Sequence, residues 1–224
     1  MTPVKTRKAV LFGATNFAQV AKFYLTIDSP YEVVAFCINR DKLSGDEFDG
    51  LPLRAFEDIE QHYPPQNHDF FVAVGSKAMN EVRERLMHEA RAKGYHLLTY
   101  VCSKATSWGD TKLGDNVFIF ENNVIQPFVS IGEGTVLWSG NHIGHHSTIG
   151  PYCFITSHVV ISGYCKVGSH TFMGVNSTVS EDVEIGARNL IGPNTLIQKT
   201  TLEGDVYIAE RTKKFPKDSS RFFR

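Results

Sequence analysis

The sequence has few cysteines, no long hydrophobic run and almost no net charge, and each absence excludes a class of protein. Its four cysteines (Cys37, Cys102, Cys153 and Cys165) show no CxxC spacing, which argues against a disulfide framework. No apolar run approaches the roughly 18 residues of a membrane-spanning helix, and residues 9–12 are too short for a signal-peptide core. With 23 Lys plus Arg against 24 Asp plus Glu, nothing marks a nucleic-acid surface. We expect a cytoplasmic protein that neither binds nucleic acid nor inserts into a membrane.

The charged residues that are present are unevenly distributed. Between Val117 and Ser180 only Glu121, Glu133 and Lys166 are charged. Five histidines fall between residues 142 and 170, and residues 211–224 carry six basic side chains against one aspartate. A histidine-rich middle followed by a basic tail points to a functional surface in the second half of the chain.

The first hundred residues alternate short apolar runs with helical patterns. We predict strands at residues 9–12, 32–38, 69–74 and 96–101, and helices at residues 17–26 and 78–92. This alternation indicates a small Rossmann-like parallel α/β sheet, which binds ligands beyond the carboxyl ends of its strands. The loop after the first strand has only Gly13, where a redox dinucleotide fingerprint needs three glycines. The N–H groups at the following helix start can still hold a phosphate.

From residue 113 the sequence repeats every six residues. Fifteen aliphatic residues occupy fifteen consecutive slots: Leu113, Ile119, Ile125, Ile131, Leu137, Ile143, Ile149, Ile155, Ile161, Val167, Met173, Val179, Ile185, Ile191 and Ile197. This period fits neither an α-helix nor simple alternation. It predicts a triangular parallel β-solenoid in which one aliphatic residue per face points inward, with three faces to an 18-residue coil.

Two further positions of the repeat have a fixed character. Glycine follows the aliphatic residue in eight hexads, and we expect it to form the corners. The fourth residue after the aliphatic one is always Val, Asn, Thr, Ser or Cys, so we expect it to face the interior. Cys153 and Cys165 then become buried packing thiols. After a one-residue shift the pattern is expected to resume at Leu202 and Ile208.

These features together resemble the hexapeptide-repeat sugar O-/N-acyltransferases, which include sialic-acid O-acetyltransferases and UDP-4-amino-sugar N-acetyltransferases. The stretches that carry the resemblance are residues 10–14, 35–39, 72–75, 143–150 and 172–177. It implies a left-handed parallel β-helix. We divide the chain into a nucleotide-sugar-binding domain (1–104), a β-helix acyltransferase domain (105–211) and a basic tail (212–224).

The resemblance places the catalytic base at His145. Histidine suits this role because its unperturbed pKa near 6.5 lets it take and return a proton at neutral pH. Relatives often have an acidic residue next to this histidine, whereas the present chain has His146. The group that orients the His145 ring is therefore left open. The candidates are His146, Asn141, His142 and an acidic residue of a neighbouring chain. A second departure is Phe154, which stands where relatives have a histidine contacting the acetyl group.

The resemblance also implies binding positions for two substrates. Coenzyme A is expected at His158, Gly163, Val175 and Lys199. The nucleotide-sugar is expected at Gly13, Ala14, Thr15, Asn39, Arg40, Gly75 and Ser76. Relatives commonly have acidic residues near Asn39 and Arg40, so the identity of the sugar does not carry over.

The function implied is acetyl-CoA-dependent N-acetylation of a nucleotide-linked amino-deoxy sugar by a homotrimer, with each active site between two subunits and no metal. Three alternatives stay open at the level of sequence. They are O-acetylation of a sialic acid, a γ-type carbonic anhydrase suggested by the histidines His142, His145, His146, His158 and His170, and a non-catalytic scaffold. The first three of these histidines are closer in sequence than the zinc ligands of such enzymes.

Overall fold

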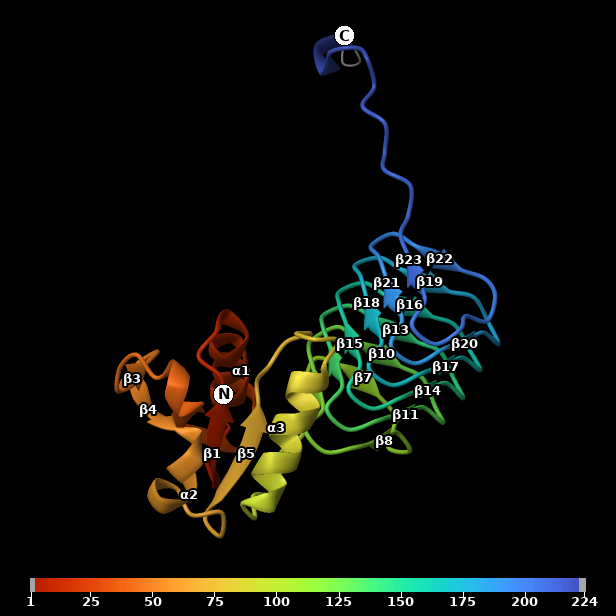
Figure 1. The fold of residues 1–224 in the computed structure, drawn as a ribbon. Helices are drawn as coiled ribbons and strands as arrows, with labels where there is room; N and C mark the ends of the chain where they lie inside the picture. Colours follow the sequence, from red (N-terminus) through yellow and green to blue (C-terminus); the bar gives the residue numbers. More distant parts are fainter. Residues whose placement is uncertain (1–2, 222–224) are drawn as a thin grey trace.

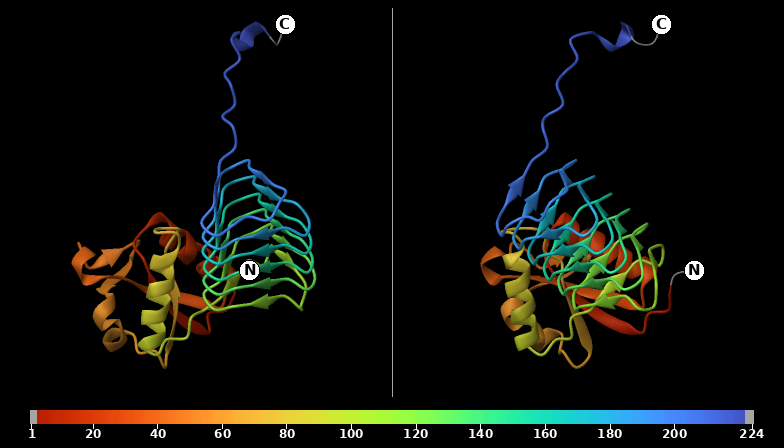
Figure 2. Two further views of the ribbon diagram at one scale, coloured as in Figure 1. Left: turned by 45° about the vertical axis from the view of Figure 1, so that its right-hand side comes forward. Right: turned by 90° about the vertical axis from the view of Figure 1, so that its right-hand side faces the viewer.

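The computed structural model describes residues 3–221 and contains two units packed side by side, followed by an extended tail (Figures 1 and 2). The first unit is a five-stranded sheet with the order β3-β4-β2-β1-β5. Only β3 runs antiparallel to its neighbour. Its elements are β1 (Arg7–Phe12), α1 (Asn16–Asp28), β2 (Tyr31–Ile38), β3 (Glu47–Phe48), β4 (Leu51–Ala55), α2 (Ile59–His62), β5 (His68–Val72) and α3 (Glu81–Ala92), with short 3-10 turns at Arg40–Lys42 and Phe56–Asp58.

The structure confirms the small α/β sheet and corrects two details of it. The strand predicted at residues 96–101 does not form, because Leu97 makes only an isolated bridge to Phe70. Tyr100 and Val101 instead begin the second unit, as β6. The β3–β4 hairpin was not predicted, since β3 is only two residues long and has no alternating apolar pattern.

The second unit is a left-handed parallel β-helix of three sheets. The first sheet contains β6 (Tyr100–Val101), β9 (Phe118–Ile119), β12 (Val136–Leu137), β15 (Phe154–Ile155), β18 (Phe172–Met173), β21 (Leu190–Ile191) and β23 (Val206–Tyr207). The second contains β7 (Thr106–Ser107), β10 (Val124–Ile125), β13 (His142–Ile143), β16 (Val160–Ile161), β19 (Thr178–Val179) and β22 (Leu196–Ile197). The third contains β8 (Lys112–Leu113), β11 (Ser130–Ile131), β14 (Thr148–Ile149), β17 (Lys166–Val167) and β20 (Glu184–Ile185).

The interior of the β-helix follows the six-residue repeat. The aliphatic residues from Ile119 to Ile197 form one continuous buried core. The small slot is also buried, and Cys153 and Cys165 are free, fully buried thiols as predicted. The predicted continuation at Leu202 and Ile208 is wrong, because both are about three-quarters exposed and Tyr207 pairs with Ile191 instead.

The role predicted for the glycines is also corrected. The glycine after each aliphatic residue does not have a left-handed backbone; the left-handed residue stands three positions after the aliphatic one and is usually not glycine. These residues are Asn116, Asn122, Phe128, Gly134, Gly140, His146, Tyr152, His158, Tyr164, His170, Asn176, Asp182, Arg188 and Asn194. The other glycines are needed because coils approach closely: a Cβ at Gly144 or Gly168 would lie 2.4 Å from a backbone nitrogen of the next coil.

The three corners of the triangle have different surroundings. The α1 corner (residues 121–122, 139–140, 157–158 and 175–176) lies beside α1, and the α3 corner (133–134, 151–152, 169–170 and 187–188) lies against α3. Between them, the outer face of the first sheet packs Phe118 and Phe154 against Phe17 of α1. The third, distal corner (127–128, 145–146, 163–164, 181–182 and 199) is therefore opposite the α/β unit.

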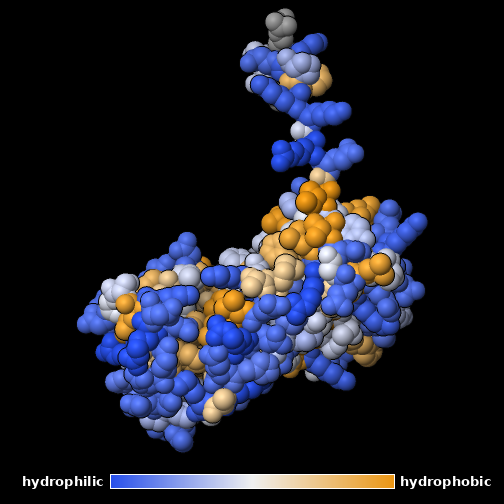
Figure 3. Space-filling model, viewed as in Figure 1, coloured by the Kyte–Doolittle hydropathy of each residue, from blue (hydrophilic) through white to orange (hydrophobic). Residues whose placement is uncertain are grey.

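The last coils lead into the tail. Exposed apolar side chains gather over these coils where the tail leaves the β-helix (Figure 3), among them Leu196, Val206 and Ile208. Residues 222–224 of the predicted tail lie outside the described part of the chain. In residues 3–221, no helix is long and apolar enough to cross a membrane.

The close approach of coils gives a first prediction. Gly168→Ala would place its Cβ 2.4 Å from the Ala187 nitrogen, so we expect it to lower the free energy of unfolding by about 1–3 kcal/mol or more. Gly109→Ala is the matched control, because a Cβ there meets no atom within 4 Å; it should change stability by less than about 0.5 kcal/mol. Urea denaturation of both variants checks this, and equal midpoints would contradict it.

Candidate active site

His145 lies on the distal corner, directly after β13, with its ring held between side chains and the next coil. Its backbone N–H donates to the Gln126 side chain (2.8 Å), and its Nδ1 lies 3.2 Å from Nδ1 of His146. A Cβ at Gly163 would come within 2.8 Å of Cε1 of His145, so the ring lies over that glycine. His145 is half-buried, whereas His146 is exposed.

The left-handed backbone at this corner produces a ladder of rings. Phe128, His146 and Tyr164 occupy the same position in three successive coils. The His146 ring is 4.6 Å from that of Phe128 and stacks on Tyr164 at 4.9 Å, with an interplanar angle of 19°. The edge of the His145 ring meets Tyr164 at 5.0 Å. Stacking therefore fixes His146 in the orientation that contacts His145.

The positions expected to hold coenzyme A fall on two different corners. Gly163 and Lys199 share the distal corner with His145, and in residues 3–221 the Gly163 N–H finds no acceptor. Lys199 is exposed three coils beyond His145, which is about 14 Å at the usual strand spacing. His158 and Val175 are exposed on the α1 corner instead. A single chain therefore does not bring the four positions together.

Phe154 contributes no polar group near these positions. It is buried between the two units, where its ring stacks on Phe172 and meets the Phe17 ring edge to face. The His158 ring lies over Gly140 of the preceding coil, because a Cβ at Gly140 would fall 2.6 Å from it.

A cavity of 890 Å³ lies at the carboxyl ends of β1, β2 and β5. The sheet order places β2 and β5 on opposite sides of β1, so the cavity lies where the winding direction reverses. Five of the seven expected nucleotide-sugar positions line it: Gly13, Ala14, Thr15, Asn39 and Gly75. Its charged lining consists of Asp41, Lys42, Glu47, Lys77 and Arg85.

The remaining two expected positions lie outside the lining. Arg40 forms an ion pair with Asp58 at the surface, which turns its side chain elsewhere. Ser76 lies in the turn that leads to α3, where its carbonyl accepts from Asn80. Gly13 fits its position closely, since it has φ +131 and a Cβ there would lie 2.8 Å from the Ala73 carbonyl oxygen.

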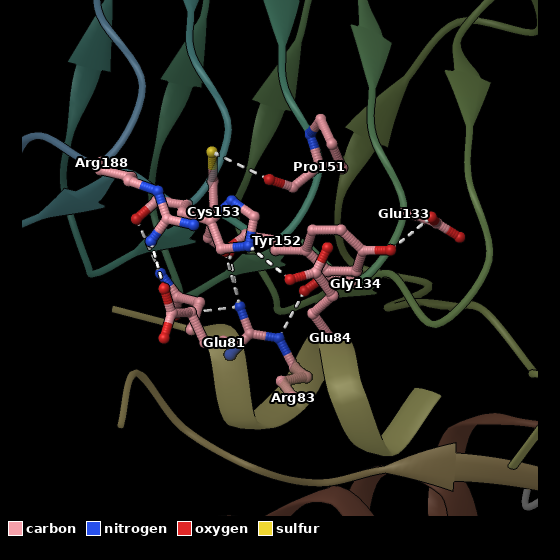
Figure 4. A network of polar contacts seen from close by, with 11 residues as sticks. Glu81, Arg83, Glu84, Glu133, Gly134, Pro151, Tyr152, Cys153 and Arg188 are labelled. Atoms are coloured by element: carbon pink, nitrogen blue, oxygen red, sulfur yellow. Dashed lines mark hydrogen bonds and ion pairs between the residues drawn. The ribbon is translucent and has the colours of Figure 1, made fainter. Parts of the chain in front are cut away.

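Arg83 of α3 is a buried residue beside the cavity that sequence reasoning missed (Figure 4). It is fully buried, and burial lowers its pKa to about 10, so it stays charged at neutral pH. Its guanidinium donates to the Val74 and Gly75 carbonyls at 3.0 and 2.9 Å. The same group donates to carbonyls of Gly134 and Tyr152 in the β-helix. Arg83 thereby connects the cavity wall at Val74 and Gly75 to the β-helix through hydrogen bonds.

Polar contacts between α3 and the β-helix surround this buried cation. Glu81 pairs with Arg188, and Glu84 lies 3.1 Å from Nε2 of His170. His170 and His158 project from different corners than His145. In the described residues 3–221, no three His, Cys, Asp or Glu side chains are grouped as a metal site would require.

Comparison with known proteins supports the repeat and the fold described above. Residues 129–163 match the model described as bacterial transferase hexapeptide (six repeats). This segment of the chain is similar to the hexapeptide repeats of bacterial transferases. No protein of curated function matches the sequence of the chain.

Several solved structures have the same fold along nearly the whole chain. The acetyltransferase domain of PglB from Neisseria gonorrhoeae is 20% identical with a TM-score of 0.78, over 90% of this chain and 96% of its own. PerB from Caulobacter crescentus, solved with CoA and GDP-perosamine, is 21% identical with a TM-score of 0.78, over 92% and 95%. WeeI from Acinetobacter baumannii is 18% identical with a TM-score of 0.71, over 91% and 97%.

The Arg83 network gives a second prediction. Arg83→Met leaves buried carbonyls without donors, so we expect it to lower the free energy of unfolding by about 3 kcal/mol or more. The control is Arg85→Met on the same helix, which removes only the exposed ion pair with Glu89 and should cost less than about 1 kcal/mol. Urea denaturation measures both, and a similar small loss in the two variants would contradict a structural role for Arg83.

Proposed function

We propose that this protein is an acetyl-CoA-dependent N-acetyltransferase that acts on the amino group of a nucleotide-linked amino-deoxy sugar. The observation that carries the proposal is the His145 ring, oriented by His146 and lying over Gly163 on an accessible corner of a hexapeptide β-helix. PerB, which shares the fold, was crystallised with CoA and a nucleotide-linked amino sugar, and this supports the same pair of substrates here.

The cavity in the α/β unit supports binding of the nucleotide. Its floor includes the N-terminus of α1, where N–H groups and the helix dipole favour a diphosphate. Lys42 and Lys77 at its rim add positive charge. In this proposal Gly13, Ala14 and Thr15 bind the diphosphate, and Asn39 and Gly75 contact other parts of the nucleotide.

The active site is proposed to form between two subunits of a homotrimer. His145 projects from the distal corner, while the cavity lies on the far side of the same β-helix, so a chain cannot present its own bound sugar to its own His145. Pairing the distal corner of one subunit with the α1 corner of the next would also bring Gly163 and Lys199 next to His158 and Val175. Coenzyme A would then lie between the two β-helices.

The chemistry follows from the hydrogen bonds at His145. We assign the proton between the two rings to Nδ1 of His145, which leaves its Nε2 lone pair free to act as a base. The neutral sugar amine attacks the thioester carbonyl while Nε2 removes a proton from its nitrogen. The Gly163 N–H stabilises the oxyanion. Collapse breaks the carbon–sulfur bond, and the proton on His145 passes to the departing coenzyme A thiolate.

A thiol-release assay tests this function directly. The purified protein is given acetyl-CoA with a panel of UDP-, GDP- and dTDP-linked 3- and 4-amino-6-deoxy sugars, with free sialic acid alongside. We expect thiol release with one nucleotide-linked amine and at least a 100-fold slower rate for His145→Ala, because the general base is lost. Release only with sialic acid would move the assignment to O-acetylation, and near wild-type turnover by an intact His145→Ala variant would remove His145 from its role.

The orienting role of His146 gives a separate prediction. His146→Ala removes the acceptor for Nδ1 of His145, so a fraction of the rings takes the unproductive tautomer. We expect kcat to fall about tenfold, which corresponds to about 1.4 kcal/mol, with KM for the sugar unchanged. Tyr164→Phe keeps the ring that stacks on His146 and serves as the control. If His146→Ala raised KM and left kcat unchanged, His146 would contact substrate rather than position His145.

A further inference from the structure

A second hollow, a groove of 580 Å³, lies between α1 and the α1 corner of the β-helix. Its walls are largely apolar and aromatic, and its one charged residue is Glu121. The lining residues are Gln19, Val20, Phe23, Tyr24, Phe120, Glu121, Trp138, Ser139 and Ser157. A single carboxylate in apolar surroundings is an arrangement that favours a cationic ligand.

The carboxylate of Glu121 is held in place but not neutralised. Its Oε2 accepts from the Tyr24 hydroxyl at 2.6 Å, and its Oε1 accepts from the Ser139 hydroxyl at 2.8 Å. Although burial opposes it, these hydrogen bonds lower the pKa of Glu121, which is therefore ionised at neutral pH. Lys104 lies near enough for its charge to help lower this pKa, but among residues 3–221 no lysine or arginine forms an ion pair with Glu121. Each oxygen keeps a lone pair for a further donor.

The groove is also lined by Trp138, whose buried indole N–H has no hydrogen-bond partner within the described chain. The Trp138 ring is fixed by parallel stacking on Phe120, with ring centres 4.5 Å apart. A ligand that brings a cation would pair with Glu121, and the fixed Trp138 ring, which also lines the groove, lies close enough to report its binding.

The groove lies within reach of the nucleotide cavity. Thr15, at the start of α1, lines the cavity, and Gln19 and Tyr24 line the groove four and nine residues further along, which corresponds to about 6 and 13 Å of helix. Tyr24 is the residue that donates to Glu121. A ligand with its diphosphate at the start of α1 can therefore extend its sugar along the helix toward Glu121.

We propose that Glu121 binds the protonated amino group of the acceptor sugar and thereby selects an amine over a hydroxyl at the acylated carbon. This inference rests on the proposed function and names a specificity residue for it. The bound ammonium releases one proton to solvent, and the partner subunit's His145 takes a second as the carbon–nitrogen bond forms. A sialic acid carries a carboxylate, which Glu121 would repel.

The test uses Trp138 as a reporter. The chain has two tryptophans, and Trp108 is exposed, so Trp108→Phe leaves Trp138 as the only source of indole fluorescence. In this background we titrate nucleotide-linked 4-amino-6-deoxy sugars and the matching 4-hydroxy sugars. We expect the amine to bind about tenfold or more tightly than its hydroxyl counterpart, as a hydrogen bond to a charged group implies. Glu121→Gln should reduce this ratio to within about twofold.

Two further variants test the charge of Glu121 and its position. Glu203→Gln removes the charge of an exposed glutamate at the end of the β-helix and should retain the preference for the amine. Glu121→Asp keeps the charge but withdraws the carboxylate, so it should narrow the amine-to-hydroxyl ratio. If Glu121→Gln were unstable, an unchanged ratio in Glu121→Asp would overturn the role of Glu121.

Acetyl transfer measured in parallel separates this inference from the proposed function. Amine-selective quenching without any transfer would support the groove and overturn the proposed function. Transfer to an amine with an unchanged amine-to-hydroxyl ratio in Glu121→Gln would support the function and overturn the role of Glu121. Absence of both quenching and transfer would overturn both.

Discussion

The buried guanidinium of Arg83 is the interaction on which the arrangement of the two units depends. Burying a cation without a carboxylate partner is costly, and this chain offsets the cost with backbone carbonyls from both units. Carbonyl acceptors at fixed backbone positions leave the guanidinium one orientation. The cavity wall at Val74 and Gly75 is consequently held at one distance from the β-helix.

The corners of the β-helix impose a second constraint, and the distal corner makes use of it. A left-handed backbone is unfavourable for large side chains and costs of order 1–3 kcal/mol per residue, yet Phe128, His146 and Tyr164 all adopt it. The stacked coils supply the compensation, since His146 N–H donates to Pro127 and Tyr164 N–H to the His145 carbonyl. The resulting ladder of rings holds the His146 ring against His145 in a fixed orientation.

The parts of the structure that could be predicted from the sequence are those that repeat. Fifteen aliphatic residues at one period require a solenoid, because no other regular structure buries every sixth residue. The repeat failed to predict the last coil, where Tyr207 rather than Ile208 pairs with Ile191. Arg83 could not be predicted, because its spacing along α3 is that of an ordinary helix residue and its partners are backbone carbonyls, which carry no sequence signal. Arg40 was predicted to contact the nucleotide-sugar, but its side chain pairs with Asp58. Nothing in the sequence indicates this pair, because the two residues lie on separate segments of the chain.

The two departures from the resemblance are consistent with one kind of acceptor. His146 supplies orientation to His145 but no negative charge, and Phe154 supplies no donor, so the site has less means of generating a strong nucleophile than one with a carboxylate and a second histidine. A hydroxyl acceptor has a high pKa and needs a strong base as it attacks, whereas a neutral amine already carries its nucleophilic lone pair and sheds its proton mainly after the bond has begun to form. The proposed reaction with an amine therefore does not require a carboxylate beside the base. In that proposal the carboxylate of Glu121 acts at the acceptor's side, where it would bind the ammonium.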